Sequence, residues 1–156
     1  MEIERKYRVI NELWAPLGNP LKGALIRQAY LSIDPACTVR IRITGNQAFL
    51  TVKGESRGIC REEFEYKVPM ADGIEIMKMA KTDVISKYRY KVEFRGYTWE
   101  VDEFFGDNEG LILAEVELKD ESEQPEWPGW VGSEVSGDPR FYNLNLALHP
   151  FKTWTP

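Results

Sequence analysis

The chain has 156 residues, of which 43% are hydrophobic, and this size and composition predict one globular domain over residues 1–156. Its net charge of −5 argues against a protein that binds duplex nucleic acid, and no apolar run is long enough to span a membrane. No cationic segment followed by an apolar one opens the chain, so we expect a cytoplasmic protein.

Residue types that support common catalytic and metal sites are scarce. The two cysteines, Cys37 and Cys60, lack CxxC spacing, and we predict that both are ordinary thiols. The single histidine, His149, stands beside Pro150 and is expected to be structural or exposed. Classical zinc, Cys–His and Ser–His–Asp sites therefore lack their components.

Most of the chain alternates between apolar and polar residues, which is typical of β-strands. Strands are predicted at residues 1–9, 22–31, 36–44, 47–54, 60–68, 84–95, 97–105 and 111–119. Gly45–Asn46 and Arg95–Gly96 are predicted to form tight turns between neighbouring strands. Because hairpins dominate this order, we expect an antiparallel sheet.

Three short segments have a helical pattern and are expected to pack on the outside of the sheet. Each begins at a predicted N-cap residue, namely Asn11, Asp72, or Asp138 with Pro139 after it. Each carries an apolar stripe; the stripes are Leu13, Trp14 and Leu17, then Ile74, Met77 and Ala80, then Phe141, Leu144 and Leu148.

Residues 121–133 combine prolines, glycines and charged residues with two tryptophans, Trp127 and Trp130. This composition predicts an irregular surface loop that the two indole rings pin to the domain. Contact with a partner protein is the alternative reading of the same tryptophans.

Nearly every predicted strand carries charged residues two positions apart, which places them on one face about 6.6 Å from each other. The sets are Glu2, Glu4 and Lys6; Arg40 and Arg42; Glu63 and Glu65; Lys87, Arg89, Lys91 and Glu93; Glu100 and Asp102; and Glu115 and Glu117. Apolar residues separate them, so each strand has one charged face and one apolar face.

Two geometries fit this pattern: an open sheet with its charged face in water, or a barrel with its charged face inward. Like charges on one strand repel, and an anion beside the basic pairs and divalent cations beside the acidic pairs would relieve that repulsion. Arginine and lysine bind phosphoryl oxygens, and carboxylates bind Mg²⁺ or Mn²⁺. A tunnel that holds a metal–polyanion complex is therefore favoured.

The segment GNPLKGAL at residues 18–25 has the glycine spacing of a phosphate-binding P-loop. Ala24 and Leu25 stand where that motif requires lysine and serine or threonine, so this segment does not compete for the phosphate.

The pattern Glu2-x-Glu4-x-Lys6 resembles the ExExK signature of the CYTH, or triphosphate tunnel metalloenzyme, superfamily. Further motifs follow in that family's order: VRIR at 39–42, TVKG at 51–54, EFEY at 63–66, Lys87-x-Arg89, WEVD at 99–102 and AEVEL at 114–118. The resemblance covers about residues 1–149 and is closest to compact bacterial members. It implies an α+β fold: an eight-stranded antiparallel β-barrel that forms a tunnel, with a few helices outside.

The resemblance also implies roles for individual residues. The expected metal ligands are Glu2, Glu4, Glu115 and Glu117, with Asp102 as a ligand of the metal or of its water shell. The expected triphosphate-binding residues are Arg40, Arg42, Lys53, Lys87 and Arg89. Lys6 would contact phosphate or place the nucleophilic water, which makes Lys6, Glu2 and Glu117 the expected catalytic residues.

Three further residues have an open role in this scheme. Glu63 and Glu65 would orient basic residues or assist a second metal, or else form internal ion pairs. Tyr30 would reach Lys6 if its side chain points inward, or else serve as an ordinary strand tyrosine.

The function that this resemblance implies is hydrolysis of inorganic tripolyphosphate to pyrophosphate and phosphate with Mg²⁺ or Mn²⁺. Three alternatives stay open: a thiamine or nucleoside triphosphatase, a class IV-type adenylate cyclase, and a polyphosphate-binding module without turnover. Members of the cyclase branch often carry an HF pair before ExExK, whereas only Met1 precedes Glu2 here. The expected partner is a small triphosphate, and a homodimer is compatible with the sequence.

Overall fold

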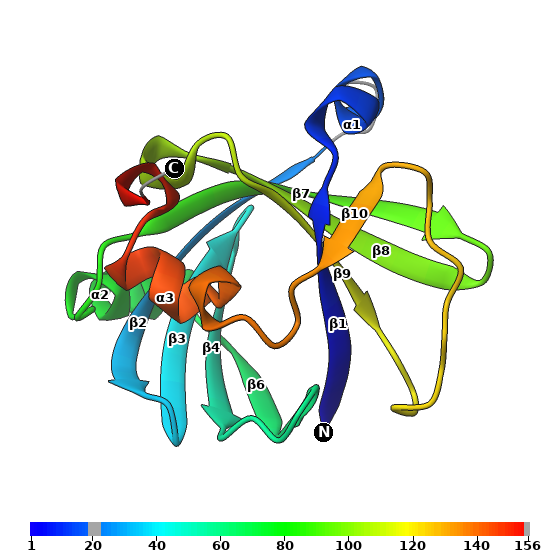
Figure 1. Ribbon diagram of the computed structural model, residues 1–156. Helices are drawn as coiled ribbons and strands as arrows, with labels where there is room; N and C mark the ends of the chain where they lie inside the picture. The colour runs from blue at the N-terminus through cyan, green and yellow to red at the C-terminus, as the bar shows by residue number, and fades with distance from the viewer. Residues whose placement is uncertain (19–22, 155–156) are drawn as a thin grey trace.

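A curled antiparallel sheet forms the body of the molecule (Figure 1). The computed structural model describes residues 1–18 and 23–154. Within them the strands are β1 (Glu2–Val9), β2 (Ala24–Asp34), β3 (Cys37–Thr44), β4 (Gln47–Gly54), β5 (Cys60–Arg61), β6 (Glu63–Val68), β7 (Ile85–Phe94), β8 (Tyr97–Phe105), β9 (Ile112–Glu117) and β10 (Val131–Glu134). Neighbouring strands follow the order β10-β1-β9-β8-β7-β2-β3-β4-β6.

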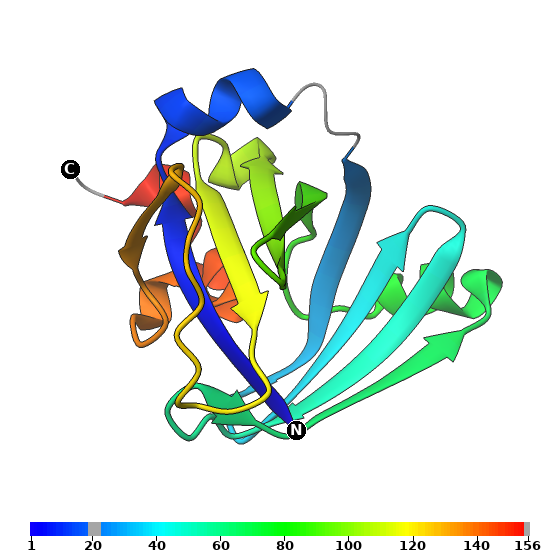
Figure 2. The ribbon, with the colours of Figure 1, turned by 90° about the vertical axis from the view of Figure 1, so that its right-hand side faces the viewer.

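The two ends of this strand order meet at β5. Glu2 of β1 pairs with Arg61, and Ile3 pairs with Cys60, while β6 begins two residues after β5 and pairs with β4. The sheet therefore returns to β1 through only two residue pairs, and β6 runs away from β1 beyond that point (Figure 2).

The predicted α+β class and antiparallel sheet are confirmed. Two details of the predicted eight-stranded barrel differ in the described residues, which form ten strands. The predicted strand at 60–68 divides into β5 and β6, because its first residues pair with β1 and the rest pair with β4. The predicted loop at 121–133 ends in β10, which pairs with β1. The start of the predicted strand at residue 22 and most of GNPLKGAL lie outside the described residues.

The predicted separation of charged and apolar faces is present in the sheet. On β8 and β9 the outward residues Trp99, Val101, Ala114 and Val116 are fully buried in an apolar cluster with Trp14 and Trp130. The residues between them include Glu100 and Glu115, which line the interior. The apolar side thus lies under the outer elements, and the charged side faces inward.

A second apolar cluster fills one end of that interior. Phe104 pairs with Lys87, and Leu113 pairs with Asp102, so these apolar residues share the inward face with the charged ones. Phe141 and Leu146 of the C-terminal segment pack against them. The polar part of the interior is therefore bounded at one end by side chains of the C-terminal segment.

The first predicted helix exists as α1 (Asn11–Gly18), but its predicted cap and stripe are wrong. The carbonyl of Ile10 accepts from the backbone amides of Leu13 and Trp14, so the helix begins one residue earlier than predicted. The side-chain Nδ2 of Asn11 instead donates to the carbonyl of Gly110. Only Trp14 of the stripe is buried, because its ring packs edge-on against Tyr90 and Trp130. Leu13 and Leu17 are exposed.

The second predicted helix is α2 (Met70–Lys78), and Pro69 rather than Asp72 takes its N-cap position. Proline fits a helix start because the missing N–H would have no partner within the helix there. The helix therefore begins earlier than predicted, and Asp72 lies in its first turn. The buried contact of α2 is made by Gly73 on Ala48, whereas Ile74 of the predicted stripe is exposed.

Asp138 caps a helical turn as predicted, since its carboxylate accepts from the amide of Arg140. The turn is the 3₁₀ helix η2 (Pro139–Phe141), and α3 (Asn143–Leu148) follows it; the two other 3₁₀ helices are η1 (Gly106–Asn108) and η3 (Phe151–Thr153). Because the helix restarts at Asn143, Leu146 is buried and Leu148 of the predicted stripe is exposed.

The remaining sequence predictions have mixed outcomes. Of the two loop tryptophans, Trp130 is buried, whereas Trp127 is 59% exposed and touches the ring of Tyr7. Both cysteines are free thiols, and His149 is exposed. Among the described residues, no helix has the length and apolar character needed to cross a membrane.

We predict that Gly73→Ala destabilises the fold by about 1–3 kcal/mol, because the added methyl would overlap the β-carbon of Ala48. Ala48→Gly in the same chain should restore most of the loss, since it removes the overlapping atom. Urea unfolding of both single variants and the double variant measures this coupling. Equal stability of Gly73→Ala and the native chain would contradict the close packing of α2 on β4.

Candidate active site

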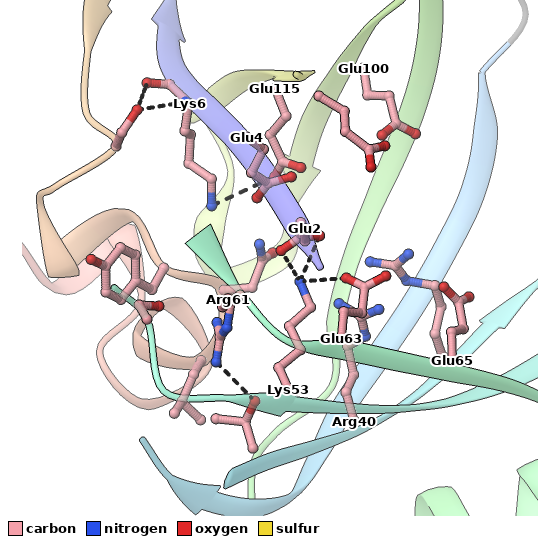
Figure 3. Close-up of a pocket in the computed structure, with 18 of the residues that line it drawn as sticks. Glu2, Glu4, Lys6, Arg40, Lys53, Arg61, Glu63, Glu65, Glu100 and Glu115 are labelled. Atoms are coloured by element: carbon pink, nitrogen blue, oxygen red, sulfur yellow. Dashed lines mark hydrogen bonds and ion pairs between the residues drawn. The ribbon is translucent and has the colours of Figure 1, made fainter. Parts of the chain in front are cut away.

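The inward face of the sheet encloses a cavity of about 1030 Å³ (Figure 3). The charged residues that line it are Glu2, Glu4, Lys6, Arg40, Arg42, Lys53, Glu55, Arg61, Glu63, Glu65, Arg89, Lys91, Glu100, Glu115 and Glu117. Twelve of the fourteen site residues predicted from the sequence, Tyr30 included, line this cavity, and the other two, Lys87 and Asp102, lie behind its surface.

One wall is acidic and is built by β1 and β9. Glu4 pairs with Glu117, and Lys6 pairs with Glu115, so the strand register brings both predicted carboxylate pairs together. Glu2 lies on the same face of β1 as Glu4, two residues before it, where β1 pairs with β5; we call this contact the β5 junction. Glu117 is exposed at the cavity edge, whereas Glu115 is buried.

The carboxylates of this wall repel one another. Burial raises the pKa of Glu4 well above its usual range, and the negative charges of Glu115 and Glu2 raise it further. Burial would also raise the pKa of Glu115, but the ammonium of Lys6 and the guanidinium of Arg89 hold that pKa at about 2. Ionised Glu4 is therefore unfavourable at this wall, and a bound cation would stabilise its ionised form.

The facing wall is basic and is built by β3 and β4. Arg40 is buried, and its Nη2 donates to Thr51 Oγ1 at 3.1 Å, but its Nε has no partner among the described residues. Burial lowers the pKa of Arg42 to about 9, and repulsion from two neighbouring arginines contributes. A buried guanidinium donor without an acceptor is costly, so an anion in the cavity would satisfy it.

Lys53 joins the two walls at the β5 junction (Figure 3). Its Nζ lies 3.0 Å from Glu2 Oε1 and 3.2 Å from Glu63 Oε2. Burial raises the pKa of Glu2 to about 7, and its hydrogen bond with Glu63 adds to this, while Lys53 opposes it. Glu63 thus forms the ion pair that was one of its two predicted roles, and Glu65 lines the cavity as an exposed residue.

Arg89 of β7 is clamped by carboxylates. Its Nε and Nη2 donate to the two oxygens of Asp102 at 2.7 and 2.9 Å, and its Nη1 donates to Glu100 at 3.2 Å. Lys87 is fully buried and lies 2.8 Å from Asp102 Oδ2. Both oxygens of Asp102 therefore hold cations behind the cavity surface, which is not the metal-facing position expected for it, and Lys87 likewise does not line the cavity.

The charges of this clamp shift the pKa values of Asp102 and Lys87. Burial would raise the pKa of Asp102, but Arg89 and Lys87 lower it below its usual range. Burial lowers the pKa of Lys87, and Asp102 works against that change. The clamp holds Arg89 with a fixed orientation toward the cavity.

Lys6 and Tyr30 both line the cavity, but they do not bond to each other. Lys6 Nζ lies 3.6 Å from Glu115 Oε1 and donates to the carbonyl of Phe141 at 3.1 Å. Within the part of the chain that the structure describes, the Tyr30 hydroxyl has no hydrogen bond with Lys6. Tyr30 belongs instead to the apolar cluster at the end of the interior.

Several residues at this site were not selected from the sequence. Arg61 pairs with Glu2 across the β5 junction and is held by the carbonyl of Gly54 at 2.8 Å. Glu100 belongs to one of the charged pairs in the sequence, and the structure shows that it accepts a hydrogen bond from Arg89. Gln28 and Asn143 carry no charge, so only the folded arrangement shows that they contact Arg42 and Lys87.

The donor chemistry of the acidic wall fits a hard divalent cation. Glu2, Glu4, Glu115 and Glu117 offer carboxylate oxygens, the ligands that Mg²⁺ and Mn²⁺ prefer, and their mutual repulsion would fall on binding. In residues 1–18 and 23–154, no three acidic, histidine or cysteine side chains are grouped as a ready metal site. A bound cation would therefore draw these glutamates closer together.

Comparison with known proteins places these features in a family. The family model of the CYTH domain matches residues 1–142. An inorganic triphosphatase of Acetivibrio thermocellus is 46% identical over 154 residues, which are 98% of this chain and 97% of that protein. An inorganic triphosphatase of Nitrosomonas europaea is 32% identical over 151 residues, 94% of this chain and 97% of that protein.

A solved structure agrees with these sequence comparisons. The crystal structure of the inorganic triphosphatase NE1496 superposes with a TM-score of 0.65 at 32% identity, covering 94% of this chain and 97% of that chain. The curled sheet, the opposed charged walls and these matches lead to one conclusion: the chain belongs to the CYTH domain family.

Proposed function

We propose that this protein is a divalent-metal-dependent inorganic triphosphatase that hydrolyses tripolyphosphate to pyrophosphate and phosphate. The observation that carries the proposal is that one cavity has a basic wall and an acidic wall. The basic wall contains the buried Arg40, whose Nε has no hydrogen-bond partner among the described residues, and the acidic wall contains the desolvated Glu4. The names of the two relatives at 46% and 32% identity support the same activity.

The basic residues of the cavity are suited to hold the phosphate chain. Arg40 and Arg42 lie side by side on β3, and Arg89 faces them from β7 with its orientation fixed by Asp102. Guanidinium groups donate pairs of hydrogen bonds to phosphoryl oxygens, and donors fixed beforehand stabilise charge that develops during phosphoryl transfer. Lys87 would contribute indirectly, through Asp102.

Glu2, Glu4, Glu115 and Glu117 would hold the cation, which we propose to be Mg²⁺ or Mn²⁺. When bound, such an ion would neutralise phosphate charge and help to activate water. Lys6 would hold Glu115 in place and face the reacting phosphate from the same wall. Lys53 would exchange its contacts with Glu2 and Glu63 for phosphate oxygens, which leaves Glu2 available to the cation.

A nucleoside or thiamine triphosphatase is the second candidate, because the cavity also exposes apolar surface. Ile26, Phe49 and Leu144 line it beside the charged residues, and its volume of about 1030 Å³ leaves room beyond a triphosphate group. Initial rates with tripolyphosphate, ATP and thiamine triphosphate separate the candidates. Faster turnover of an organic triphosphate would overturn our preference, and cyclic AMP formation would indicate a cyclase.

We predict that Arg40→Ala raises the KM for tripolyphosphate by about 10-fold to 100-fold, because it removes a buried donor of charge-assisted hydrogen bonds. Steady-state phosphate release measures the change. Arg27→Ala is the matched control, because Arg27 lies on the exposed face of the neighbouring strand β2. A KM for Arg40→Ala equal to that of the control would contradict the assignment.

We predict that Glu4→Gln lowers metal-dependent kcat by at least about 100-fold, in the range expected when a charge-stabilising group is removed from a site. Without metal, the same variant should unfold at a higher temperature than the native chain, since it removes repulsion with Glu115 and Glu2. Thermal unfolding in EDTA and the phosphate assay test both effects. Glu75→Gln, on the exposed surface of α2, is the control.

Loss of stability together with unchanged activity in Glu4→Gln would reverse both expectations and remove Glu4 from the site.

We predict that the metal-free native chain loses stability relative to Glu2→Gln as the pH rises from about 5 to 7. The pKa of Glu2 is about 7 in the folded chain and near 4.5 when unfolded, so between these values only the folded state keeps the proton. As the pH rises through this range, the unfolded state is stabilised by releasing its proton and the folded state is not, so the free energy of unfolding falls until the pH passes the folded pKa. Urea unfolding at several pH values in EDTA measures the difference, and parallel stability curves for the two proteins would refute the raised pKa.

A further inference from the structure

A chain of partly buried hydrogen bonds links the cations of the cavity and meets at Asn143, the first residue of α3, which itself lines the cavity. Asn143 Oδ1 accepts from Gln28 Nε2 at 3.3 Å and from Lys87 Nζ at 3.2 Å. Gln28 and Lys87 are both fully buried, so neither has water as an alternative partner.

Each branch from Asn143 ends at an arginine of the cavity. On one side, Gln28 Oε1 accepts from Arg42 Nε at 3.0 Å. On the other side, Lys87 Nζ lies 2.8 Å from Asp102 Oδ2, and Asp102 accepts from Arg89 at 2.7 and 2.9 Å. One amide oxygen on a C-terminal helix is therefore connected to arginines on β3 and β7.

The cations at the two ends fix how the amides must point. Lysine can only donate, so the atom of Asn143 that faces Lys87 must be its oxygen. That oxygen accepts from Gln28, which must present its nitrogen there and its oxygen to Arg42, another pure donor. Each of these contacts then joins a donor to an acceptor, and the two amides have one self-consistent orientation.

The same C-terminal segment also holds a further cation of the cavity, Lys6. The carbonyl of Phe141, two residues before Asn143, accepts from Lys6 Nζ at 3.1 Å. Anchoring of this segment to the fold is provided elsewhere: Asn108 donates to the carbonyl of Leu146 and accepts from the amide of Phe151 at 2.8 Å. The side-chain oxygen of Asn143 thus bonds to the network that holds the cations, whereas Asn108 anchors the segment.

We infer that Asn143 is a positioning residue, which sets the orientation of Arg42 and Arg89 toward the substrate phosphates. This inference rests on the proposed phosphate-binding function. Without the Asn143 oxygen, Gln28 and Lys87 each lose a buried acceptor, and the side chains that hold the two arginines are free to reorient. The C-terminal segment therefore acts on the chemistry through a hydrogen-bond acceptor as well as through packing.

The test compares Asn143→Leu, which keeps the size of the side chain but removes the acceptor, with Asn143→Asp, which keeps an oxygen. We expect Asn143→Leu to raise the KM for tripolyphosphate about tenfold with a smaller change in kcat, as for the loss of a hydrogen bond to a charged group. Asn143→Asp should stay within about twofold of the native KM. Asn108→Ala should lower the unfolding temperature and leave KM unchanged.

A second readout separates this inference from the proposed function. The side-chain Nε–H signals of Arg42 and Arg89, recorded by NMR without metal or substrate, report their hydrogen bonds directly. We expect the Arg42 signal to shift or exchange faster in Asn143→Leu and to be retained in Asn143→Asp and Asn108→Ala. If no variant hydrolyses tripolyphosphate, the proposed function fails, and these signals alone decide the positioning role.

Two results would overturn the positioning role. The first is a native Arg42 signal together with a native KM in Asn143→Leu. The second is an equal rise of KM in Asn143→Leu and Asn108→Ala, because the effect would then come from general loosening of the C-terminal segment.

Discussion

Charge removed from water is the constraint on which the architecture of this protein depends. A sheet that turns its charged face inward must neutralise each group, because a buried ion without a partner destabilises the fold by several kcal/mol. Asp102 with Lys87 and Arg89, and Lys53 with Glu2 and Glu63, meet that need within the chain. The ion pairs of Asp102 lie behind the cavity and stay in place, whereas the ion pairs of Lys53 can be exchanged for a ligand, and the remaining charged groups of the cavity are left for that ligand.

The groups left over define the function. Arg40 keeps a donor without an acceptor, and Glu4 lies in repulsive contact with its acidic neighbours. An anion and a cation would satisfy these two needs at once, and a metal–triphosphate complex contains both. The internal pairs hold the surrounding side chains in place, so that the site is largely formed before the ligand binds.

Much of the fold and the site was predictable from local sequence pattern. Alternation of charged and apolar residues located the main strands and their inward face, and the charged pairs identified both walls. The pairing of Glu4 with Glu117 joins residues more than a hundred positions apart, so their facing positions could be expected only through the family resemblance. The split of 60–68 into β5 and β6 likewise depends on pairing partners far away in the chain.

The local sequence pattern could not predict the role of residues whose partners are far away in the sequence. Asp102 has the same sequence signature as a metal-facing carboxylate, but the arginine and lysine of the next strand occupy both of its oxygens. Asn143 is an uncharged residue in an apolar helix, and only the folded chain brings it to Lys87 and Gln28. Two of the three predicted helix caps were wrong, because Pro69 and Ile10 take the N-cap positions that the sequence assigned to Asp72 and Asn11.

The most direct test of the two-walled site is the anomalous diffraction of crystals grown with Mn²⁺ and tripolyphosphate. We expect Mn²⁺ signal beside the carboxylates of Glu4 and Glu115, and phosphate density in contact with Arg40 and Arg42. Mn²⁺ and phosphate bound elsewhere, with the cavity unchanged, would contradict the account.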